Sequence, residues 1–103
     1  MNGIPTENKS PVLDYVRLSD VLGRAYDQAA RGKGAERHGQ GKPFHEQPMQ
    51  TISELLNSTE GMRYQVIKKV QEAARLDKDH QIHELLGAIN YIAGIVIYLE
   101  QSK

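Results

Sequence analysis

Hydrophobic residues are most concentrated near the end of the chain, in residues 85–99, which read LLGAINYIAGIVIYL. Only Asn90 and the hydroxyl groups of Tyr91 and Tyr98 interrupt this apolar stretch. A helix that is apolar on nearly all sides normally lies at the centre of a fold, where neighbouring helices or a second copy of the chain cover it. The stretch is shorter than the roughly 18 apolar residues that a membrane span requires. The pattern therefore predicts the core helix of a soluble protein.

Three earlier segments also repeat apolar residues at helical spacing. The first begins at Ser19 and ends at the glycines of residues 32–34, because glycine readily takes the left-handed geometry of a helix C-terminus. The second begins at Pro48, since proline suits a first helical turn, and ends near Asn57. The third follows a serine or threonine cap. The residues that recur at this spacing are Leu18, Val21, Leu22, Ala25, Tyr26 and Ala29 in the first helix and Met49, Ile52, Leu55 and Leu56 in the second. In the third helix, the expected buried stripe consists of Met62, Val66, Ile67, Val70, Ala73 and Ala74.

Capping residues mark where the last two helices begin. Ser58 or Thr59 caps the third helix, and an aspartate within residues 76–79 caps the final one, which continues to about Glu100. The connection between these two helices is short, so we expect them to be antiparallel neighbours. The predicted fold is all-α, a small bundle of about four helices with a central apolar C-terminal helix.

The length of 103 residues favours one domain. We expect an N-terminal arm over residues 1–18 and a single helical domain over residues 19–103. Within the arm, residues 10–18 fit either a helix start or a short extended piece.

Two glycines inside the final helix, Gly87 and Gly94, lie nearly on one face. Each costs about 1 kcal/mol relative to alanine, so another backbone is expected to pass close by. Packing against a second copy of the chain and a tight crossing within one chain explain the pair equally well. Asn90 lies among apolar neighbours, and its amide needs a partner from elsewhere. It either fixes the packing register or binds a ligand.

Charge and composition limit the binding partners and the cellular compartment that we expect. Lysine plus arginine and aspartate plus glutamate both number 13, so no overall field attracts long nucleic acid or an anionic membrane. The chain has no cysteine, which excludes a thiolate nucleophile and fits a reducing cytoplasm. The first residues lack the basic and apolar regions of a signal peptide. We expect a cytoplasmic protein that binds neither membrane nor long nucleic acid.

The segment of residues 33–48 is rich in glycine and locally basic, and we interpret it as a loop. Its glycines let backbone amides approach an anion, and Arg37, His38 and Lys42 would hold phosphate. Phe44 is a candidate for packing against a base, or it anchors the loop to the core. Gln47 is a candidate for reading base edges, or it caps the second helix. A solvated basic loop is the alternative for the whole segment.

A second basic pair, Lys68 and Lys69, is a candidate phosphate contact or a solvated helical face. Catalytic chemistry is less well supported. No acidic residue has another acid three or four residues later, as magnesium-dependent hydrolysis on helices commonly requires, so the acids would have to come from separate helices, such as Glu72 and Glu84. His80, His83 and Glu84 have a spacing that suits a divalent metal but match no established motif. We predict no catalytic residues, metal or cofactor.

Three segments resemble small phage and prophage proteins: KGAERHGQGKPF at residues 33–44, the QxxKKxxEA run from Gln65 to Ala73, and ELLGAINYIAG at residues 84–94. The chain is similar to phage proteins described as dATP/dGTP diphosphohydrolases, which resemble the all-α nucleotide pyrophosphohydrolases of the MazG kind. The likeness extends over roughly residues 30–100. It implies a helical fold, a nucleotide ligand and the cytoplasm of a phage-infected bacterium as the setting.

The acidic ExxE and ExxD pairs of the MazG-like proteins are absent from this chain. The leading hypothesis is therefore a homo-oligomeric protein that binds a nucleotide without cleaving it, and that sequesters a nucleotide or cyclic nucleotide signal of bacterial defence. One alternative is a nucleoside triphosphate pyrophosphohydrolase of the dATP/dGTP type, with acids gathered from several helices. Another is an inhibitor that binds a host enzyme directly.

Overall fold

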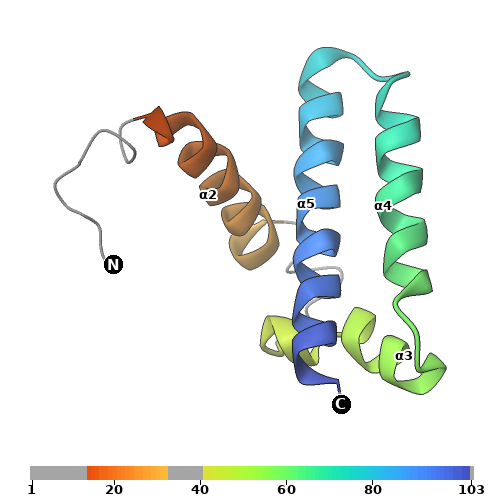
Figure 1. Cartoon of the computed structure of the whole chain (residues 1–103). Coiled ribbons are helices and arrows are strands. Elements are labelled where there is room, and N and C mark those ends of the chain that lie inside the picture. Colours follow the sequence, from red (N-terminus) through yellow and green to blue (C-terminus); the bar gives the residue numbers. More distant parts are fainter. Residues whose placement is uncertain (1–13, 33–40, 103) are drawn as a thin grey trace, which may run out of the picture.

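The computed structural model describes residues 14–32 and 41–102, and within these residues the chain is helical and has no strand. Four α-helices, α2 (Val16–Arg31), α3 (Pro48–Leu56), α4 (Glu60–Ala73) and α5 (Lys78–Gln101), are joined by loops, and a short 3-10 helix, η2 (Phe44–Glu46), precedes α3 (Figure 1). This arrangement confirms the all-α fold and the apolar C-terminal helix.

The helix ends follow the residues that sequence singled out, with three differences. α3 begins at Pro48 and α5 follows Asp77, as expected, but the Asp77 side chain makes no cap hydrogen bond and pairs with His80 instead. α2 begins at Val16 and so includes residues that we had assigned to the arm. α2 ends at Gly32 as predicted, but this glycine has φ −98° and not the left-handed conformation. Glycine is favoured there because a Cβ would lie 2.8 Å from the carbonyl oxygen of Gln28.

α5 is the common packing partner of the other helices. α4 runs antiparallel beside it, as the short connection predicted, while α2 crosses one part of α5 and α3 lies near its C-terminal end (Figure 1). By length and composition alone α5 is long and apolar enough to cross a membrane. In this fold, one side of α5 is covered by α2, α3 and α4.

The core of the described chain is small. Its buried apolar side chains are Ala25, Met62, Ala73 and Ala88, of which only Met62 is large. Gln50 on α3 is also buried, and its Nε2 donates a hydrogen bond of 2.8 Å to the carbonyl oxygen of Gly94 on α5. Helix packing therefore rests on small residues that allow close approach and on one buried polar contact.

Three residues of the predicted buried stripe, Ile67, Val70 and Ala74, are exposed, and for these the prediction was wrong. Several apolar residues that mark the two earlier helices are exposed as well: Leu18, Leu22 and Tyr26 on α2, and Ile52, Leu55 and Leu56 on α3. Leu55 is the extreme case, with 86% of its surface exposed. The helical spacing identified apolar faces correctly, but no described element of the same chain covers these faces.

Candidate functional site

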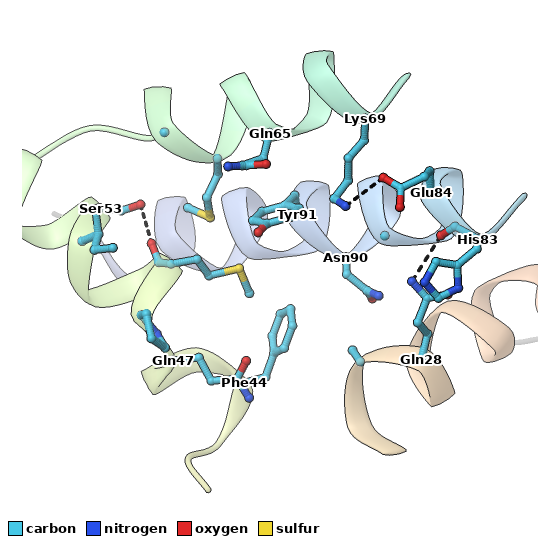
Figure 2. Close-up of a pocket in the computed structure, with 17 residues that line it drawn as sticks. Gln28, Phe44, Gln47, Ser53, Gln65, Lys69, His83, Glu84, Asn90 and Tyr91 are labelled. Atoms are coloured by element: carbon cyan, nitrogen blue, oxygen red, sulfur yellow. Dashed lines mark hydrogen bonds and ion pairs between the residues drawn. The ribbon is translucent and has the colours of Figure 1, made fainter. Parts of the chain in front are cut away.

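A pocket of about 480 Å³ opens where α2, η2, α3, α4 and α5 meet. Figure 2 shows the side chains that point into it from these elements. The α3 and η2 side of the pocket is mainly apolar, and the side formed by α2, α4 and the first half of α5 is mainly polar. The cavity is thus suited to a ligand with one apolar and one polar part.

An ion pair marks the polar end. Lys69 on α4 places its Nζ 3.2 Å from Oε1 of Glu84 on α5, and the two side chains are 24% and 31% exposed (Figure 2). The ammonium group also lies 6.0 Å from the centre of the Tyr91 ring. The lysine also passes beside Gly87, where a Cβ would lie 3.4 Å from Nζ, an ordinary contact distance. The lysine is therefore held within the pocket and not extended into solvent.

Two hydrogen bonds attach α2 to this end. Nε2 of Gln28 donates to the carbonyl oxygen of His83 at 3.2 Å, and Nδ2 of Asn90 donates to the carbonyl oxygen of Ala25 at 2.9 Å. Nδ2 is hydrogen-bonded to α2. The amide oxygen of Asn90 can therefore accept a hydrogen bond from a ligand in the pocket.

Phe44 lies at the apolar end together with Pro48, Met49, Ile52 and Met62. Its ring points toward Asn90 across the cavity (Figure 2). Gln47 supports the segment before α3, since its Nε2 donates to the carbonyl oxygen of Lys42 at 3.0 Å. The Phe44 ring and the Asn90 amide therefore face the same space from opposite sides.

Gly94 explains how the apolar end fits against α5. A Cβ at this position would lie 2.9 Å from Sδ of Met62 and 3.2 Å from Sδ of Met49. Gly87 and Gly94 thus both face other elements of the same chain. Close packing within the chain explains Gly94, although the neighbouring atoms are side chains and not the expected backbone. At Gly87 the nearest side-chain atoms lie at ordinary contact distance, so this packing does not require a glycine there.

Tyr91 contributes a hydroxyl group whose ionisation is suppressed. Burial raises the pKa of this phenol above its usual value of 10.0, because the phenolate would lose solvation. At neutral pH the hydroxyl is therefore protonated and can both donate and accept a hydrogen bond in the pocket.

The structure brings together four of the residues selected from sequence, because Phe44, Gln47, Lys69 and Asn90 all line the pocket. Lys68 is exposed on α4 and does not line it. Lys42 is also exposed, and its recorded contact is through its carbonyl oxygen to Gln47. The two remaining candidates, Arg37 and His38, lie outside the described residues.

Sequence reasoning missed several polar lining residues, among them Gln28, Gln65 and Tyr91. Tyr91 had a usable signal, because it lies four residues after Gly87 and next to Asn90 on the same part of the helix. Gln28 had none, since its partner, the carbonyl oxygen of His83, is 55 residues away in the chain.

The residues considered as metal ligands do not gather in one place, and two of them are paired with other side chains. Nδ1 of His80 pairs with Asp77, Glu84 pairs with Lys69, and Glu72 is exposed on α4. Within residues 14–32 and 41–102, no group of three or more histidine, cysteine, aspartate or glutamate side chains could hold a metal ion.

Comparisons of the chain with protein-family models, curated proteins and solved structures found no match.

Proposed function

We propose that the pocket binds a nucleotide, with the base at the apolar end and a phosphate at Lys69. The observation that carries this proposal is the placement of an aromatic ring, a primary amide and a partly buried lysine around one cavity of about 480 Å³. This volume is within the range of about 300–1,000 Å³ that is usual for small-molecule sites.

The base has suitable partners on both sides of the cavity, Phe44 at the apolar end and two residues of α5 facing it. Phe44 offers a ring face on which a purine or pyrimidine can stack, and stacking tolerates different bases. The amide oxygen of Asn90 can accept a hydrogen bond from an exocyclic amino group, and the Tyr91 hydroxyl can serve as donor or acceptor. Recognition then combines one stacking contact with two directional contacts.

We propose that the phosphate replaces the Glu84 carboxylate as the partner of Lys69. A lysine held by a single carboxylate at 3.2 Å can instead bind an anionic ligand oxygen. Arg37, His38 and Lys42 remain proposed phosphate contacts, because their segment leads directly into Phe44 at the edge of the pocket.

The residues of the pocket favour binding of the nucleotide without its hydrolysis. Glu84 is the one carboxylate among the described lining residues, and it is paired with Lys69. Magnesium-dependent hydrolysis usually requires several oxygen ligands. We therefore infer a protein that sequesters a nucleotide or cyclic nucleotide. The resemblance to phage proteins further suggests the cytoplasm of an infected bacterium and a signal of bacterial defence as the target.

The test is a thermal-shift and calorimetric titration with nucleoside mono-, di- and triphosphates and cyclic nucleotides. Replacing Lys69 by glutamine should weaken binding about tenfold, which corresponds to about 1.4 kcal/mol. Glu84→Gln should strengthen it, because the lysine is then free for the ligand. Lys68→Gln is the matched control and should change nothing, since Lys68 lies outside the pocket.

Three results would contradict the proposal. The first is the absence of any shift in Tm with the whole panel. The second is an equal loss of affinity in Lys69→Gln and Lys68→Gln, which would indicate nonspecific attraction. The third is release of pyrophosphate from a deoxynucleoside triphosphate with magnesium, which would favour the pyrophosphohydrolase. Arg37→Ala, tested in the same titration, determines whether the basic segment takes part.

A further inference from the structure

A continuous apolar stripe runs along α5 on the side that residues 14–32 and the rest of residues 41–102 leave open. It consists of Ile82, Leu85, Ile89, Ile92, Val96 and Leu99, which alternate at spacings of three and four residues. All of these except Ile89 are among the exposed large hydrophobic residues, and Ile89 is half-buried. At 1.5 Å per residue, the stripe is about 25 Å long.

The stripe lies opposite the pocket. Successive residues of an α-helix are rotated by about 100°, so Gly87, Asn90 and Gly94 point roughly the other way from Leu85, Ile92 and Val96. The first three residues contact other elements of the chain or line the cavity. The face that holds the pocket and the face that carries the stripe are thus separate surfaces of one helix.

The neighbouring helix α4 extends this surface. Ile67 and Val70 are 67% and 52% exposed. Ile67 is two residues from both Gln65 and Lys69, which line the pocket, so it points to the other side of α4. We call the stripe together with Ile67 and Val70 the outer face.

We propose that a second copy of this chain packs on the outer face, so that the α4–α5 pairs of two protomers form a four-helix core. The alternating spacing of three and four, with isoleucine or valine at every second position, is the pattern of helices that pack against one another in coiled coils and bundles. The stripe contains no charged residue, and the chain has no net charge to oppose self-association.

The size of the outer face is close to what such a contact requires. α5 contributes about 25 Å of length and α4 about 21 Å, so the two helices, each about 10 Å wide, present a projected surface of about 460 Å² per protomer. A dimer then buries about 900 Å² of projected surface in total, which is close to the lower limit for a specific interface. The same contact would add a large apolar core to the small one that the described residues form alone. The pocket would remain accessible, so this inference stands or falls independently of nucleotide binding.

The first experiment measures the oligomeric state of the full chain by sedimentation equilibrium over a range of concentrations. The wild-type chain should form a dimer or a multiple of one, and Ile92→Glu should yield monomers or unfold. Leu55→Glu is the matched control, because Leu55 is exposed on α3 outside the outer face, and this variant should assemble as wild type does. A wild-type chain that is monomeric at about 100 μM, far above the Kd of a stable dimer, would overturn the proposal.

A second experiment does not depend on the folding of a charged variant. The chain lacks cysteine, so single cysteines can be introduced cleanly at Leu85, Ile92 and Leu99, with Leu55→Cys as control. Oxidation should link two copies through Ile92→Cys if the helices are antiparallel, and through all three positions if they are parallel. Absence of any link, or equal linking at Leu55→Cys, contradicts the proposal. Cosedimentation of a monomeric wild-type chain with phosphatidylcholine vesicles would instead assign the outer face to a lipid surface.

Discussion

Asn90 on α5 donates a hydrogen bond from Nδ2 to the carbonyl oxygen of Ala25 on α2, and the two residues are 65 positions apart in the chain. Ala25 is itself buried. A directional bond at the crossing of two helices fixes their relative position, because sliding α2 by one residue would remove the acceptor. The structure thus gives Asn90 a register role, and its ligand role remains a proposal.

Replacing Asn90 by alanine should therefore destabilise the fold. The carbonyl oxygen of Ala25 would lose its side-chain partner, and we expect the free energy of unfolding to fall by about 1–2 kcal/mol. Urea denaturation followed by circular dichroism measures this change. Gln71→Ala, at an exposed position of α4, is the control and should have little effect. An Asn90→Ala variant as stable as wild type would contradict the register role.

Alanine substitutions at three glycines should separate helix propensity from packing. In Gly61→Ala, where nothing lies within 4 Å of the new Cβ, the propensity gain should raise the free energy of unfolding by up to about 1 kcal/mol. Gly87→Ala meets Lys69 only at 3.4 Å and should also be tolerated. Gly94→Ala should be less stable than either, because the Cβ would lie 2.9 Å from Sδ of the buried Met62. Equal Tm values for all three variants would refute this order.

The conformation of Asn57 predicts opposite effects of two small substitutions. This residue ends α3 with φ 53° and ψ 45°, the left-handed region that glycine and asparagine tolerate best. Asn57→Ala should cost about 1 kcal/mol, while Asn57→Gly should be neutral or slightly stabilising. Thermal denaturation of the two variants beside wild type distinguishes these outcomes. An alanine variant as stable as the glycine variant would be inconsistent with the described turn.

The start of α5 should respond to pH through His80. The hydrogen bond and the charge of Asp77 raise the pKa of this exposed histidine above 6.5. The pKa of His80 is therefore higher in the folded state than in the unfolded state. The contribution of the pair to stability is complete below about pH 6.5, and it is lost as the pH rises through the folded-state pKa. Between about pH 6 and about pH 8, wild-type stability should therefore decline more than that of His80→Gln or Asp77→Asn. The same slope in all three proteins would show that the pair does not contribute.

Most helix boundaries could be predicted because they depend on local chemistry. Pro48 fits a first helical turn, Asp77 precedes a helix, and the short connection before it forces α4 and α5 to be antiparallel. The burial of side chains could not be predicted in the same way. Ile67 and Leu55 recur at helical spacing, but spacing reveals only that a face is apolar and not which molecule covers it.

The candidate site was only partly predictable for a related reason. Phe44, Lys69 and Asn90 stood out because an aromatic residue, a basic pair and a lone amide are conspicuous in their surroundings. The partnership of Lys69 with Glu84 crosses between helices, as does that of Gln28 with His83. Contacts of this kind depend on the exact crossing of helices, which no local pattern specifies.

The attachment of α2 has a consequence for how the cavity opens. This helix rests mainly on α5, through the buried Ala25 and two hydrogen bonds that each involve a single amide side chain. This attachment is slighter than that between α4 and α5, so α2 should undock by local unfolding more readily than the α4–α5 pair separates. Its departure would carry Gln28 and Ala29 away from the wall and admit a solute. Amide hydrogen exchange in α2 should accordingly be fast in the free protein and slow once the cavity is filled.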